Sequence, residues 1–102
     1  MKGQLSNGTR DVDCTNNGSG VPKGATGVLV NLTVVNTSAT GFLAAYKKGL
    51  TFPGTSSINW NLPGTIVANT TIVAVDADAT LTCLVPASSS TDFFVDVIGY
   101  FR

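Results

Sequence analysis

The aspartates are the side chains in this chain best suited to acid–base or metal chemistry, and they fall into close pairs. The chain contains no histidine, so the commonest general base and every Ser-His-Asp or Cys-His arrangement are excluded. A glycosidase needs two carboxyls that face each other across a cleft, and nothing in the pattern predicts one. We therefore expect no catalytic residues, no cofactor and no enzyme. The pairs are Asp11/Asp13, Asp76/Asp78 and Asp92/Asp96.

Asp76 and Asp78 flank Ala77 in a short polar connection between two apolar segments. Aspartate is favoured in turns because its carboxylate accepts hydrogen bonds from nearby backbone amides. We expect turn chemistry here. The alternative is a Ca²⁺ or catalytic site built on the same two carboxylates.

Three polar side chains stand within otherwise apolar stretches: Asn31, Asn69 and Asp96. A polar group inside a hydrophobic strand needs hydrogen-bond partners. We interpret all three as a structural polar core, in which Asp96 accepts from backbone amides, Arg10 or Arg102. The alternative for Asp96 is a ligand or metal contact near a sheet edge.

Trp60 lies between two amides, Asn59 and Asn61, and Tyr46 precedes them. An aromatic ring with flanking amides suits a sugar, because the ring stacks on the pyranose and the amides bind its hydroxyls. These four residues form a candidate carbohydrate-binding site. The opposing interpretation is a tryptophan buried in the core or in an interface.

The elements that would position these residues are all β-strands. Apolar and β-branched runs bounded by Gly, Pro, Asn and Ser predict strands, and no window shows a helical period. We expect a flexible segment over 1–9 and one domain over 10–102, an antiparallel β-sandwich of jelly-roll or Ig-like type with about seven strands. The serine-rich stretch 86–91 is predicted to be a surface loop. The expected strands cover residues 10–14, 28–35, 42–46, 57–60, 65–75, 79–85 and 92–102.

The composition of the chain limits the kinds of partner that it can bind. Charged residues are 12% of the chain and the net charge is zero, so the chain is not basic enough to bind nucleic acid. No run of about 18 apolar residues predicts a membrane span. Abundant Thr, Ser, Asn and Gly in place of charge suit a protein outside the cell.

Three predicted strands are apolar on both faces: 28–35, 65–75 and 92–102. A two-sheet sandwich covers only one face of each sheet. Large exposed apolar patches are unusual on monomers, so another surface is needed to cover the remainder. We expect a closed homo-oligomer, with a trimer favoured over a dimer.

The chain contains these motifs in order: Gly-Val-Pro-Lys-Gly-Ala-Thr at 20–26, Val-Asn-Leu-Thr at 30–33, Gly-Phe-Leu at 41–43 with Tyr46 and Gly49, Ser-Ile-Asn-Trp at 57–60, Val-Ala-Asn at 67–69 and Val-Asp-Val-Ile-Gly-Tyr-Phe at 95–101. In order and spacing they resemble a repeat module of secreted and cell-surface multidomain bacterial proteins. Members of that module end in a similar Val-Asp-Val-x-Gly-Tyr-Phe strand. The resemblance covers roughly residues 9–102 and implies a β-sandwich accessory module on the cell exterior, for adhesion or scaffolding.

The chain has two cysteines, Cys14 and Cys83. They are either a disulfide or two buried thiols, and without histidine they make no zinc site. Some members of the module carry cysteines at corresponding places, which implies a Cys14–Cys83 disulfide. Such a bond would close a loop of about 70 residues and contribute on the order of 4 kcal/mol.

Overall fold

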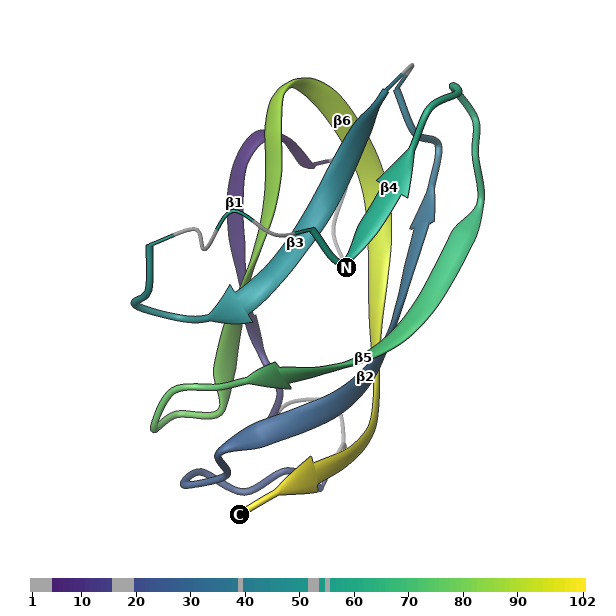
Figure 1. The fold of residues 1–102 in the computed structure, drawn as a ribbon. Helices are drawn as coiled ribbons and strands as arrows, with labels where there is room; N and C mark the ends of the chain where they lie inside the picture. Colours follow the sequence, from purple (N-terminus) through teal and green to yellow (C-terminus); the bar gives the residue numbers. More distant parts are fainter. Residues whose placement is uncertain (1–4, 16–19, 39, 52–53, 55) are drawn as a thin grey trace.

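The computed structural model describes residues 5–15, 20–38, 40–51, 54 and 56–102 of the 102-residue chain (Figure 1). Within these ranges there is no helix, and so none that could span a bilayer. The strands are β1 (Leu5–Asp13), β2 (Gly27–Val35), β3 (Gly41–Lys47), β4 (Ile58–Trp60), β5 (Val67–Ala74) and β6 (Thr80–Phe101).

The long strand β6 belongs to two sheets. Its first part pairs with β1 on one side and β3 on the other, and β3 pairs in turn with β4. Its second part pairs with β2, which pairs with β5. In Figure 1 the green start of β6 rises, arches over at the top of the view and descends as the yellow C-terminal part. The result is two antiparallel sheets packed together, which confirms the predicted all-β sandwich of about seven strands.

The predicted loop over 86–91 is wrong, because β6 runs through it without a break. Hydroxyl groups hold this arch against the segment that follows β2. The Ser89 hydroxyl donates to the Thr40 carbonyl at 2.9 Å, and the buried Thr91 hydroxyl donates to the Val35 carbonyl at 2.9 Å. The Ser90 amide donates to the Ser38 hydroxyl at 3.0 Å. The serines and Thr91 therefore satisfy a bend inside the protein, whereas the same composition typically marks a solvated loop.

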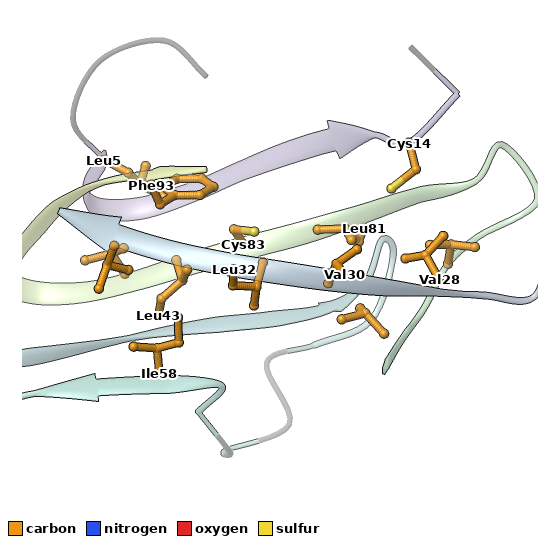
Figure 2. Close-up of a cluster of buried hydrophobic side chains, with 14 of the residues drawn as sticks. Leu5, Cys14, Val28, Val30, Leu32, Leu43, Ile58, Leu81, Cys83 and Phe93 are labelled. Atoms are coloured by element: carbon orange, nitrogen blue, oxygen red, sulfur yellow. The ribbon is translucent and has the colours of Figure 1, made fainter. Parts of the chain in front are cut away.

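The core lies between the two sheets and is built on one face of β2. Val28, Val30, Leu32 and Val34 alternate along the strand and are fully buried. Side chains on a strand alternate between its faces, so this period-2 pattern aims all four inward. They meet Leu81, Cys83 and Val85 from β6 and Leu43 and Ile58 from β3 and β4 (Figure 2). Burying one such aliphatic side chain contributes about 1.5–3 kcal/mol.

The N-terminal strand begins earlier than the sequence predicts. Residues 5–9, expected to be flexible, lie in β1 and pair with β6, while residues 1–4 are outside the described part. Arg10 of β1 places its guanidinium carbon 5.4 Å from the centre of the Phe93 ring. Arg10 thus makes a cation–π contact with Phe93, a buried core residue.

Candidate functional site

The most distinctive surface is the outer face of the three-stranded sheet formed by β5, β2 and the second part of β6. We call it the outer face. On β2 its members are the half-buried Leu29, Asn31 and Thr33, which alternate with the buried core residues. The strand registers place Thr70 and Asp96 on either side of Asn31. The next row places Ala68 and Phe94 on either side of Thr33.

Large apolar side chains are exposed on this face. Ile72 of β5 is 62% exposed, and Ile98 and Phe94 of β6 are 59% and 46% exposed. Ile66, just before β5, is 75% exposed. Exposed apolar side chains gathered on one sheet face are typical of an interaction surface.

A bulge in β6 brings Ile98 to this face out of the regular register. Val97 is opposite Val30 and Gly99 is opposite Leu29, so Ile98 is the extra residue. Beyond the bulge the alternation shifts, and Tyr100 comes opposite the core residue Val28. Phe94, Asp96 and Ile98 therefore share the outer face, whereas Tyr100 does not, because an inserted residue reverses the facing of the residues after it.

The predicted structural polar core is not in the core. Asp96 and Asn69 are exposed and Asn31 is half-buried. Asn31 and Asp96 are neighbours on the outer face, where the Thr70 hydroxyl donates to Asn31 Oδ1 at 3.1 Å. The alternation that made these residues look buried is real, but a two-sheet sandwich leaves the second face of each sheet to solvent.

Asn69 has a structural role of another kind. It lies opposite the core residue Leu32, on the edge strand β5. Its side-chain amide donates to the Ser57 carbonyl at 3.0 Å, just before β4 in the other sheet. Asn69 therefore ties the two sheets together at an open edge.

The proposed sugar-binding residues are divided between different surfaces. Trp60 is only 3% exposed and lies in the core, opposite Gly41 in the β3–β4 ladder. Tyr46, also buried, is opposite Thr82, and its position along β3 puts it on the other face of that sheet from Leu43 and Gly41. Asn59 and Asn61 are exposed. The ring of Trp60 is thus unavailable for stacking on a sugar in this structure, and the four residues do not form one surface.

The two cysteines are free and buried, and the predicted disulfide is absent. Arg10 is opposite Cys83, and four residues of extended chain, about 13 Å, separate Arg10 from Cys14. A disulfide requires Cα atoms within about 7 Å. Figure 2 shows the two thiols well apart among the core side chains. Burial raises the pKa of Cys14 to about 11 and that of Cys83 to about 12, so both stay protonated at neutral pH.

The Asp76 carboxylate organises the turn between β5 and β6 by accepting local hydrogen bonds. Asp76 Oδ1 accepts from the backbone amides of Asp78 and Thr80, both at 3.0 Å. Asp78 is exposed and lies 3.9 Å from the Lys23 ammonium. In the part of the chain that the structure describes, no group of three or more His, Cys, Asp or Glu side chains is placed to hold a metal ion.

The sequence predicts strands that are apolar on both faces, but it does not show that Ile72, Phe94 and Ile98 share one surface. Those residues come from strands more than 20 positions apart, and only the pairing of both strands with β2 brings them together. The signal was present in the alternating apolar pattern of each strand, whereas the register that joins them is not local.

No protein-family model matches this chain, and no curated protein or solved structure matches it.

Proposed function

We propose that this chain is a non-catalytic β-sandwich module that acts outside the cell by self-association, in adhesion or scaffolding at the cell surface. The observation that supports self-association is the outer face, with Ile72, Ile98 and Phe94 together exposed on one sheet. Apolar patches of this kind on a soluble domain are typical of protein–protein contacts. The number of subunits, for which the sequence favours three, stays a prediction.

The extracellular location rests on composition and on the resemblance of the motifs at 20–26 and 95–101. A chain rich in Thr, Ser, Asn and Gly, with only 12% charged residues, suits that setting. The cysteines do not support an extracellular location, because two buried thiols without a disulfide are compatible with either side of a membrane.

Sedimentation equilibrium from about 10 μM to about 1 mM tests self-association. We expect an average mass that rises above 10.5 kDa with concentration. Ile72→Thr keeps a β-branched residue but removes apolar surface from the outer face, so it should shift the rise to higher concentration.

Leu62→Thr is the matched control, since Leu62 is 69% exposed in the turn between β4 and β5, outside the three strands of the outer face. It should leave the concentration dependence unchanged. A constant mass of 10.5 kDa over the whole range would refute self-association, and an equal effect of both substitutions would show that the outer face is not the surface used.

A further inference from the structure

The two strands that flank β2 on the outer face carry side chains of matching character. In the first row Ile72 of β5 and the bulged Ile98 of β6 lie on either side of Leu29. In the middle row Thr70 and Asp96 lie on either side of Asn31. In the third row Ala68 and Phe94 lie on either side of Thr33. Each row thus pairs two side chains that would complement each other if they met: two isoleucines, a hydroxyl with a carboxylate, and a small residue with a large one.

A two-fold axis that runs along β2 makes those pairs meet. Rotation about such an axis lays β5 of one copy over β6 of the other, with β2 over β2. Ile72 then faces Ile98 of the second copy, Thr70 faces Asp96, and Phe94 faces the space above Ala68. Every contact occurs twice, as an isologous interface requires.

A two-fold axis perpendicular to the strands gives the opposite result. It lays β6 over β6 and β5 over β5, so that Asp96 faces Asp96 and Phe94 crowds Ile98. Like charges that face each other disfavour association. With the axis along β2, strand spacings of about 4.8 Å put the two Asp96 carboxylates roughly 10 Å apart, close to the Debye length at 0.1 M salt.

The axis passes over Asn31, whose side-chain NH2 group is a further hydrogen-bond donor. Its Oδ1 accepts from Thr70, and within the described part of the chain no partner is found for its Nδ2. In the complex Asn31 of one copy faces Asn31 of the second, where that nitrogen can donate to the facing amide oxygen. A polar group at the centre of an apolar interface fixes its register, as a buried asparagine does in coiled coils.

We infer, on the basis of the self-association proposed above, that two copies of this chain dock outer face to outer face about a two-fold axis parallel to β2, which makes a dimer and not the trimer that the sequence favours. Three strands of eight or nine residues cover about 14 Å by 27 Å. An interface of that extent is at the low end for specific complexes, so the dimer is weak and forms reversibly at micromolar concentrations or above.

Substitutions that change the charge at positions 70 and 96 test the arrangement. Thr70→Asp sets two carboxylates against each other at both symmetric contacts, and it should weaken dimerisation at least 10-fold at low salt. The double variant Thr70→Asp with Asp96→Lys places opposite charges at both contacts, and it should restore the dissociation constant to within about 3-fold of the unmodified protein. Both positions are exposed, and circular dichroism with a thermal melt verifies that each variant is folded.

The double variant discriminates between the two axes. With the axis perpendicular to the strands it would set Lys against Lys and Asp against Asp, so dimerisation would stay about as weak as in Thr70→Asp alone. A double variant as weak as Thr70→Asp or weaker, in a protein that otherwise self-associates, overturns the arrangement and leaves the proposed function standing. An unmodified protein that stays monomeric to 1 mM overturns both.

Discussion

Gly41 of β3 and Ser89 of β6 lie so close together that a methyl group on the Gly41 Cα would be 2.6 Å from the Ser89 Cβ. The same methyl group would be 2.9 Å from Cζ2 of Trp60. Contacts this short between carbon atoms are not tolerated in folded proteins. Glycine is therefore required where β3 passes under the arch of β6, and the requirement is one of space, because the φ angle of Gly41 is not in the left-handed region.

Gly41→Ala should destabilise the fold by about 1–3 kcal/mol or more, the usual effect of overpacking. Gly99→Ala is the matched control, since nothing lies within 4 Å of the added methyl group and Gly99 has no positive φ. Urea denaturation followed by circular dichroism measures both. Equal midpoints for the two variants would show that β3 and the arch do not approach each other this closely.

Trp60→Ala should destabilise the protein by about 3–5 kcal/mol, because it removes a large side chain that is 3% exposed from the core. Asn59→Ala, at the exposed neighbouring position, should change stability by no more than about 0.5 kcal/mol. Chemical denaturation of both variants checks the difference. A Trp60→Ala protein as stable as the unmodified one would mean that the indole is not a core residue, and the sugar-stacking hypothesis would return.

The cysteines should react as two free thiols. After denaturation without reductant, alkylation should add two groups per chain, and prior treatment with reductant should not change that number. In the native protein alkylation at neutral pH should be slow, because burial keeps both thiols protonated and inaccessible. Mass spectrometry gives the count, and a chain that takes up no label until it is reduced would restore the disulfide.

Stability should fall in alkaline solution because of the same thiols. Burial raises the pKa of Cys83 to about 12, and burial with the nearby Asp13 raises that of Cys14 to about 11, from an ordinary value of 9.0. Between these values the folded state holds protons that the unfolded state has released, so the free energy of unfolding decreases as the pH rises. The contribution is complete below pH 9 and is lost as the pH rises through 11–12, on the order of a few kcal/mol.

Denaturation curves from pH 8 to pH 11 measure this decrease. A variant with Cys14→Ala and Cys83→Ala supplies the control: its stability at pH 8 is lower, but its decline with pH should be smaller. A decline of the same size in that variant would assign the alkaline sensitivity to other groups.

The sequence predicts the strands with strong apolar alternation well and the long-range organisation poorly. β2 and β5 lie within two residues of their predicted limits, since β-branched residues fill them and turn residues bound them. The arch of β6 could not be predicted, because its serines and Thr91 bond to residues 35–40, some 50 positions earlier. Local composition cannot distinguish a hydroxyl that faces water from one that faces a distant carbonyl.

The sequence predicts that an apolar sheet surface is left uncovered, but it does not predict which residues form that surface. The two-faced pattern indicates that some apolar sheet surface lacks cover, and the outer face is that surface. Trp60, the candidate for sugar stacking, is in the core, as the opposing interpretation states, and Asp96, expected in a polar core, is exposed. Each strand has two faces, and which of them turns inward depends on pairing partners that the sequence does not specify.

Because β6 is shared by both sheets, a pull applied at Phe101 along that strand would load the whole β2–β6 ladder in shear. The nine paired positions from Gly27 to Val35 would have to yield together instead of opening one after another. Force that passed this ladder would travel through the arch into the pairing with β1 and β3. β6 would therefore carry the load between the two sheets. The rate of forced unfolding would be set by the barrier to breaking the β2–β6 ladder.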